Sequence, residues 1–317
     1  RLQGDWSSDV CSSDLSSPTR DVPNTPQTFA NSCSRARSES VITNVDMGAF
    51  VPGDILVDRY RVERHLGKGT TSDVYLALDF VTEEQVALKH LRITGERATA
   101  RFVREATTLA KLQHRSIVRV HAHHDDPPLL AMELLVGRTL AAQLAAGDPP
   151  GRYETRAIGR SIASALVQVH AAGLVHRDVK PSNVLLARDR IVLFDFGLVT
   201  GGAVLTSPGQ LLGTLSYLAP EVFLGKHATS ATDIYALGCI LHELLLGTPP
   251  ETFSLRAPLR EKAERAVQQG RPELPPTRDP ELATLVAECL DPDPDQRPTA
   301  KRIFTKLSES TLIRAHG

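Results

Sequence analysis

The chain has little of what would mark a disulfide-linked, membrane-spanning or strongly charged protein. Its four cysteines follow no regular spacing, which argues against a disulfide framework or a zinc site. No run of about 18 or more uncharged apolar residues is present, so the sequence predicts no membrane-spanning helix. The longest apolar stretch, IYALGCILHELLLG, is interrupted by His242 and Glu243. With 36 basic and 37 acidic residues, the net charge of −1 favours neither nucleic acid nor a membrane surface as a partner.

The N-terminal segment lacks both an initial methionine and any hydrophobic periodicity. DWSSDVCSSDL, which ends at residue 15, matches one reading frame of a common sequencing-library adapter. We therefore interpret residues 1–15 as an artefact, with a native Ser/Asp-rich tail as the alternative. Residues 16–54 are interpreted as a disordered or non-native leader, because residues 16–46 are rich in Ser, Thr, Asn and Pro and show no hydrophobic periodicity. Met47 is the candidate start, since patterned sequence begins soon after it.

Alternating apolar residues predict short strands in the next part of the chain. RYRVERHLG, SDVYLALD and QVALKHL alternate around a glycine-rich turn, and SIVRVHAHH and PLLAMELL indicate two more strands. Between them, ATARFVREATTLAKLQH has the period of a helix. One helix face holds Glu105 together with Phe102, Ala106, Leu109 and Gln113. A carboxylate on a face that packs against the core needs a cationic partner.

From Thr139 onward the pattern becomes helical. ETRAIGRSIASALVQVHAAG is a long helix closed by Gly173, and ATDIYALGCILHELLLG is apolar enough to be central. DPELATLVAECL and TAKRIFTKL complete the predicted set, and no internal repeat is visible. The change of pattern predicts a small β-rich lobe that ends near Leu135 and a larger, mostly helical lobe.

The segment LVHRDVKPSNVLL, Leu174 to Leu186, carries the strongest signal. It matches the catalytic-loop pattern H-R-D-x-x-x-x-N followed by a strand. Over residues 55–308 the chain resembles the bacterial eukaryotic-like (Hanks-type) Ser/Thr protein kinases. The resemblance implies the α+β, two-lobed protein kinase fold, with an N-lobe over 55–135, a C-lobe over 136–308 and a tail over 309–317.

The resemblance implies a role for each catalytic-loop side chain. Asp178 would accept the proton of the substrate hydroxyl, and Asn183 would hold a magnesium ion. Lys180 is similar to the lysine of Ser/Thr-directed kinases, which steadies the γ-phosphate. Asp195, the first residue of DFG, would bind the same kind of ion between the phosphates. Ser182 does not support a preference for arginine-rich substrates.

Two further pairings follow from the same resemblance. In QVALKHL, alternation places Ala87 and Lys89 on one face of the strand, opposite Val86 and Leu88. Lys89 would reach the α- and β-phosphates and pair with Glu105, which gives that carboxylate its cationic partner. The segment GTLSYLAPE ends in a glutamate, Glu221, that would pair with Arg297 of DQRPTA; an ordinary ion pair remains the alternative for Lys89 and Glu105.

The glycine-rich turn, LGKGTTSDVYLA, departs from the family pattern at one position. Gly67 and Gly69 are present, but Ser72 stands where a third glycine is expected. Because serine is small, we expect weaker nucleotide affinity rather than its loss. The full set of residues predicted to bind the nucleotide is Leu66, Gly67, Lys68, Gly69, Val74, Ala87, Lys89, Met132, Glu133, Leu135 and Leu185.

The predicted cofactors are ATP and Mg²⁺, with Mn²⁺ as an alternative ion. The predicted partners are proteins with Ser or Thr acceptors, and a second copy of the chain for autophosphorylation in trans; a cytoplasmic location is expected. Arg177 resembles arginines that bind an activating phosphate, and Thr206 or Ser207 would carry it, with unmodified hydroxyls as the alternative. Thr214 would contact Asp178 and Lys180.

Other functions remain open at this stage. A pseudokinase, a nucleotide-binding scaffold without transfer, is supported by Ser72 alone. A small-molecule phosphotransferase of similar fold is disfavoured by the A-P-E segment and by Lys180. The cluster HAHHDD, residues 121–126, resembles a set of metal ligands, but a solvated surface is the favoured interpretation.

Overall fold

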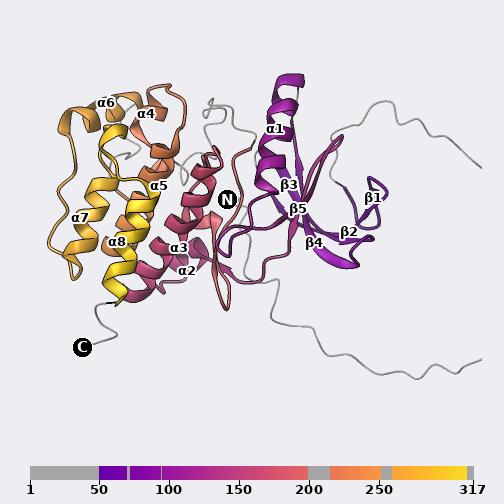
Figure 1. Cartoon of the computed structure of the whole chain (residues 1–317), viewed down its shortest axis with the longest axis horizontal. Helices are drawn as coiled ribbons and strands as arrows, with labels where there is room; N and C mark the ends of the chain where they lie inside the picture. The colour runs from indigo at the N-terminus through magenta and orange to yellow at the C-terminus, as the bar shows by residue number, and fades with distance from the viewer. Residues whose placement is uncertain (1–49, 70–71, 94, 199–214, 251–258, 313–317) are drawn as a thin grey trace, which may run out of the picture.

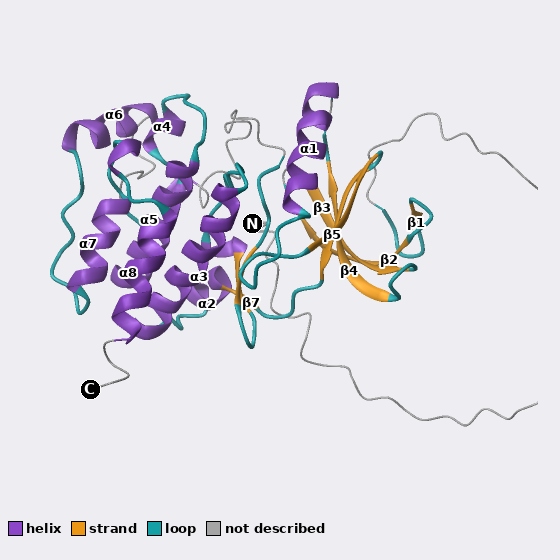
Figure 2. Ribbon diagram, viewed as in Figure 1, coloured by secondary structure: helices purple, strands orange, loops and turns teal. Residues whose placement is uncertain are grey.

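A computed structural model describes residues 50–69, 72–93, 95–198, 215–250 and 259–312. These residues form two lobes, with sheet and one long helix in the first and mostly helices in the second (Figure 1). The first lobe is an antiparallel 6-stranded sheet in the order β1-β2-β3-β4-β6-β5, with α1 beside it (Figure 2). Its elements are β1 (Ile55–Leu56), β2 (Tyr60–Lys68), β3 (Ser72–Asp79), β4 (Glu84–Leu91), α1 (Glu96–Leu109), β5 (Val120–Asp125) and β6 (Pro128–Glu133).

The two faces of β4 divide as the alternation predicted. Ala87 belongs to the main core that joins both lobes, and Lys89 shares its face. Val86 and Leu88 belong to a second apolar cluster on the outer face of the sheet. Because successive side chains of a strand point to opposite faces, the single lysine of this strand faces the second lobe together with Ala87.

Helix α1 is shorter than its pattern predicted. Phe102, Ala106 and Leu109 are buried, as expected for the core face. The chain leaves the helix after Leu109, where the N–H of Leu112 bonds the Leu109 carbonyl in a tight turn. Gln113 therefore lies beyond the helix and is exposed, so its assignment to the core face was wrong.

The second lobe is built around α5. Its elements are α2 (Leu140–Ala145), α3 (Arg152–Ala171), α4 (Pro220–Phe223), α5 (Ser230–Leu246), α6 (Leu259–Gln269), α7 (Pro280–Cys289), α8 (Ala300–Leu312) and the small sheet of β7 (Arg138–Thr139), β8 (Val184–Leu186) and β9 (Ile191–Leu193). A Thr229 capping box starts α5, and Gly247 ends it in a left-handed conformation at φ 83°. An L side chain is strained at such a φ, so glycine fixes the end of the helix.

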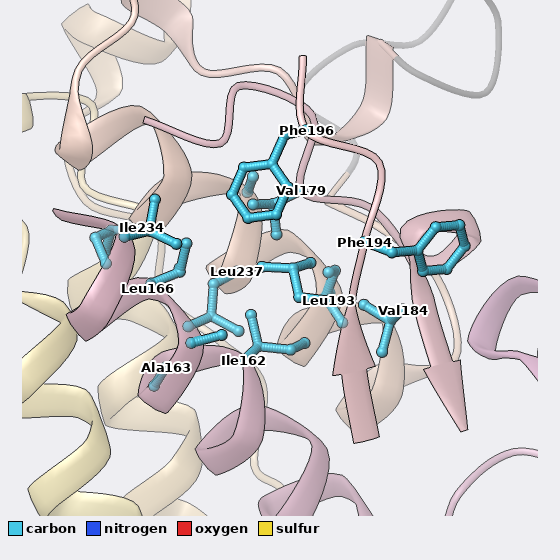
Figure 3. Packing of buried hydrophobic residues seen from close by; sticks show 14 of the residues in the cluster. Ile162, Ala163, Leu166, Val179, Val184, Leu193, Phe194, Phe196, Ile234 and Leu237 are labelled. Atoms are coloured by element: carbon cyan, nitrogen blue, oxygen red, sulfur yellow. The ribbon is translucent and has the colours of Figure 1, made fainter. Parts of the chain in front are cut away.

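The core of this lobe lies directly beneath the loop that precedes β8. Ile162 and Leu166 of α3 and Leu237 of α5 meet Val179 of that loop and Leu193 of β9 in one cluster (Figure 3). All of these residues are almost completely buried. Since a packed interior resists displacement, the loop rests on a rigid base.

The ion pair between Arg59 and Asp79 predicts a pH-dependent stability. Asp79 is fully buried and accepts two hydrogen bonds from the guanidinium, at 2.8 and 2.7 Å. The hydrogen bond from Arg59 lowers the pKa of Asp79 to about 2, although burial opposes this. A lowered folded-state pKa stabilises the fold above the unfolded pKa near 4, and this stabilisation is lost as the pH falls toward 2. We expect Asp79→Asn to lose about 2 kcal/mol at neutral pH.

Urea unfolding at several pH values checks this prediction. The difference in unfolding free energy between the two proteins should shrink between about pH 4 and pH 2. A constant difference over that range would show that the pair contributes through packing and not through charge.

No helix among the described residues is both long and apolar enough to cross a membrane.

Candidate active site

The loop before β8 brings three functional side chains together. Asp178 Oδ2 lies 2.9 Å from Lys180 Nζ. Asn183 Nδ2 donates hydrogen bonds of 2.8 Å to both the backbone carbonyl and the Oδ2 of Asp178. Pro181–Asn183 forms one turn of 3₁₀ helix, which turns Asn183 back toward Asp178. The sequence-predicted trio is therefore assembled around one carboxylate.

Asp233 of α5 holds this loop in place from below. Its two carboxylate oxygens accept the backbone N–H groups of His176 and Arg177, each at 2.9 Å. The same carboxylate lies 2.9 Å from His170 Nε2. Arg177 adopts φ 67°, a conformation that needs such support. Asp233 is not part of any motif described above, although an aspartate in the first turn of the most apolar helix is a visible signal.

His176 links the loop to the Asp195 segment. Its imidazole lies 3.1 Å from the Phe194 carbonyl oxygen, and its ring centroid is 4.4 Å from that of Phe196. Burial lowers the pKa of His176, so its ring is neutral at physiological pH. The histidine thus has a structural role, and it fixes the start of the segment that carries Asp195.

Asp195 pairs with Lys89, across the two lobes. The Lys89 ammonium donates a hydrogen bond to Asp195 Oδ1. Burial would raise the pKa of the Asp195 carboxyl, but Lys89, with a contribution from Lys180, holds it below its usual value. Lys180 therefore acts on both aspartates, which places Asp178 and Asp195 in one electrostatic site.

Glu105 does not have the partner that the sequence predicted. Its carboxylate accepts hydrogen bonds of 2.9 and 3.0 Å from Arg177 Nη1. Among the ion pairs of the described residues, none joins Glu105 to Lys89. The expected Lys89–Glu105 pair is therefore wrong for this structure. The carboxylate does have a cationic partner, but that partner is Arg177, while Lys89 is engaged by Asp195.

Comparison with known proteins identifies the family. The family model of the protein kinase domain matches residues 60–307. The chain belongs to the protein kinase family. It is 43% identical over 199 residues to serine/threonine-protein kinase PknE of Mycobacterium bovis, covering 60% of this chain and 35% of that protein. It is 40% identical over 206 residues to serine/threonine-protein kinase PknL of Mycobacterium tuberculosis, covering 62% of this chain and 52% of that protein.

A third relative extends the match. The chain is 35% identical over 255 residues to a Streptomyces coelicolor protein named "Probable serine/threonine-protein kinase SCO3848", covering 75% of this chain and 38% of that protein. The chain thus spans between 35% and 52% of the length of these relatives. The predicted resemblance to bacterial serine/threonine kinases and the two-lobed kinase fold are confirmed. The names of the relatives give no support to a pseudokinase.

In this protein kinase domain, the predicted nucleotide residues surround the junction of the two lobes. Val74, Ala87, Met132 and Leu185 are buried in the core cluster, and Leu66 and Leu135 pack against it. These apolar side chains come from both lobes, so they can form the two walls of an adenine site.

Glu133 contributes differently from the apolar residues. Its carboxylate accepts hydrogen bonds from the Arg119 backbone N–H at 2.8 Å and from Arg190 Nη2 at 2.6 Å. The side chain is therefore engaged with the residue before β5 and with the β8–β9 turn. The Glu133 backbone N–H also bonds the Arg119 carbonyl oxygen, at 2.9 Å, so neither the side chain nor this N–H is open to a nucleotide. Sequence analysis did not predict this network.

The flanks of the glycine-rich turn are well paired. Gly67 faces Val74 and Lys68 faces Asp73 across β2 and β3. The Gly69 N–H bonds the Ser72 carbonyl at 2.7 Å. Ser72 is only 7% exposed and continues the strand pairing opposite Leu91. Serine is thus accommodated as an ordinary strand residue, without a conformation that would require glycine.

The Glu221–Arg297 pair is present as predicted. Arg297 donates hydrogen bonds of 2.8 Å to both oxygens of Glu221. The three activation-segment hydroxyls of the prediction, at Thr206, Ser207 and Thr214, lie outside the described residues.

The donor atoms of the site fit the predicted metal. Asn183 offers an amide oxygen and Asp195 an ionised carboxylate, which are the ligand types that Mg²⁺ takes. The histidines of the HAHHDD segment have other neighbours: His123 Nε2 lies 3.0 Å from Thr107 Oγ1, and His124 Nε2 lies 3.3 Å from the Tyr60 hydroxyl. No group of three or more His, Cys, Asp or Glu side chains suited to a metal is found in the described ranges.

Proposed function

We propose that this domain transfers the γ-phosphate of Mg-ATP to serine and threonine hydroxyls of proteins. The single observation that carries the proposal is the cluster of Asp178, Lys180 and Asn183 facing an ionised Asp195 that is paired with Lys89. Bound Mg²⁺ would supply positive charge at the phosphates, held by Asn183 and Asp195. Because the transfer needs ATP, which is supplied inside the cell, we propose that the domain lies in the cytoplasm.

Each residue has a distinct task in the transfer. The Asp178 carboxylate orients the acceptor hydroxyl and takes its proton, and its hydrogen bond from Asn183 fixes its rotamer. Lys180 and Lys89 place positive charge where negative charge develops, which is the main need of a loose phosphoryl-transfer transition state. Positioning by the rigid base beneath the loop supplies much of the remaining barrier reduction.

The choice of Ser and Thr over Tyr rests on Lys180 and on the relatives. Lys180 lies beside Asp178, where it can also contact the γ-phosphate, and the matched proteins are named serine/threonine-protein kinases. The test is transfer of labelled γ-phosphate from Mg-ATP to the protein itself and to generic acceptor proteins, followed by phosphoamino-acid analysis. Phosphoserine and phosphothreonine are expected. Label no higher than that of an Asp178→Asn control, with ATP still bound, would favour the pseudokinase.

We further propose that autophosphorylation releases Glu105 from Arg177. A phosphate at Thr206 or Ser207 adds close to two negative charges and would compete with the Glu105 carboxylate for the Arg177 guanidinium. Glu105 would then be free for Lys89, which also needs an anionic partner when Asp195 binds a metal. Two copies of the chain would phosphorylate each other, so the rate per molecule should rise with concentration.

Arg177→Gln tests this switch. Before phosphorylation, the variant should be at least as active as the wild-type protein, because Glu105 is no longer held. After incubation with Mg-ATP, we expect the wild-type activity to rise about tenfold, and the variant to rise less than about twofold, in line with ordinary coupling energies. Initial rates after phosphatase treatment and again after autophosphorylation measure both quantities.

Phosphosite mapping in the same samples is the control. Phosphate on Thr206 or Ser207 is expected. Phosphate found only on Thr200, or nowhere between Asp195 and Glu221, would contradict the proposed switch, as would equal activation of the variant.

A further inference from the structure

Arg92 joins the glycine-rich turn to the strand that carries Lys89. It follows β4 directly, and its Nη1 lies 2.5 Å from Asp73 Oδ2. Its Nη2 donates a hydrogen bond to the carbonyl oxygen of Gly69. One guanidinium therefore contacts the turn on the β2 side, through Gly69, and on the β3 side, through Asp73.

These contacts lie on the outer face of the sheet. Asp73 alternates with Tyr75, which belongs to the outer apolar cluster, and Asp73 pairs in register with His90. Arg92 alternates with His90 and Leu88 of the same face. Lys89 and Val74 point to the opposite face. Arg92 thus holds the turn from the side opposite the predicted phosphates, where it does not compete with them.

The geometry fixes the backbone of Gly69. Its N–H donates to the Ser72 carbonyl at 2.7 Å, and its own carbonyl accepts from Arg92, so both polar groups of this glycine have partners. Glycine is the residue with the greatest backbone freedom, and these two bonds remove much of it. Asp73 is 8% exposed in its side chain and needs a cation, so the ion pair also keeps Arg92 in place.

We infer that Arg92 is a positioning residue for nucleotide phosphates. It acts through Gly69, by fixing the backbone at the described end of the glycine-rich turn that the phosphates are predicted to contact. This inference rests on the proposed ATP-dependent function. Without the guanidinium, nucleotide binding must itself fix the backbone of Gly69. The entropic cost of doing so lowers the affinity for the nucleotide. Adenosine has no phosphates and does not use the turn in this way, so its affinity should not depend on Arg92.

Direct binding measurements on the whole chain test this. We expect Arg92→Gln to raise the Kd for Mg-ATP about tenfold, the loss of roughly one charge-assisted hydrogen bond, and to change the Kd for adenosine less than about twofold. Asp73→Asn should raise the Kd for Mg-ATP by a smaller factor. The double variant should match Arg92→Gln alone, because the two residues act as one unit. Arg61→Gln is the matched control, since Arg61 lies in β2, is 47% exposed and, within the described ranges, pairs with Glu63 and the Phe80 ring.

Three results would overturn the inference. The first is an unchanged Mg-ATP affinity in Arg92→Gln. The second is an equal loss of adenosine affinity, which would indicate general damage to the lobe. The third is a double variant whose loss of Mg-ATP binding free energy equals the sum of the losses in the two single variants. Wild-type protein that binds adenosine but not Mg-ATP would overturn the proposed function itself, which distinguishes the two failures.

Discussion

Asp178→Asn is expected to reduce phosphoryl transfer by at least about a hundredfold, the range found when a positioned general base is removed. Affinity for Mg-ATP should stay within about twofold, because the nucleotide contacts predicted above do not include Asp178. Asparagine keeps the size of the side chain and an oxygen that can accept the Asn183 hydrogen bond, now 2.8 Å long. It removes the negative charge beside Lys180 and the capacity to take a proton.

Single-turnover transfer to a generic protein acceptor measures this effect, with Mg-ATP binding measured separately. Asp189→Asn is the matched control, since it makes the same chemical change at an exposed position in the turn after β8 and should leave the rate unchanged. If Asp178→Asn kept more than about a tenth of the wild-type rate, Asp178 would be only an orienting group and the proton would leave by another route.

The second large effect concerns stability. Arg297→Met is expected to lower the free energy of unfolding by about 3 to 5 kcal/mol, because it leaves a buried carboxylate without its partner. The side chains of Arg297 and Glu221 are 0% and 5% exposed, and the guanidinium also donates to the carbonyl oxygens of Ala231, Asp291 and Pro292. The pair links α4, which carries Glu221, to the segment just before α8, and the bond to the Ala231 carbonyl ties the same guanidinium to α5.

Denaturant unfolding of four variants separates the causes. The double variant Glu221→Gln with Arg297→Met should cost clearly less than the sum of the two single variants, since no unpaired charge then remains. Arg302→Met is the control: Arg302 is 58% exposed and pairs with Glu288, so its removal should cost no more than about 1 kcal/mol. A loss below about 1 kcal/mol for Arg297→Met would mean that water replaces the arginine, and that the pair does not anchor the lobe.

Local pattern predicted most of the elements, because a strand or helix exposes its period in a few adjacent residues. Alternation placed Ala87 and Lys89 on one face of β4, opposite Val86 and Leu88, and the structure confirms this division and shows that their face is the inner one. The same reasoning found the long α3 and the central α5. It failed at Gln113, because the turn that ends α1 depends on how the chain leaves the helix toward β5 and not on helical period.

The sequence by itself therefore determined the family and the register of the catalytic loop through its motifs, and the resemblance to that family implied the Glu221–Arg297 pair. Only the tertiary structure decided which cation Glu105 would meet. It also showed that Asp233 supports the loop and that Arg92 reaches Gly69. The physical reason is that the Coulomb attraction between side chains does not depend on their separation along the chain. Several arginines and lysines could satisfy each carboxylate, and the packing of the two lobes selects one of them.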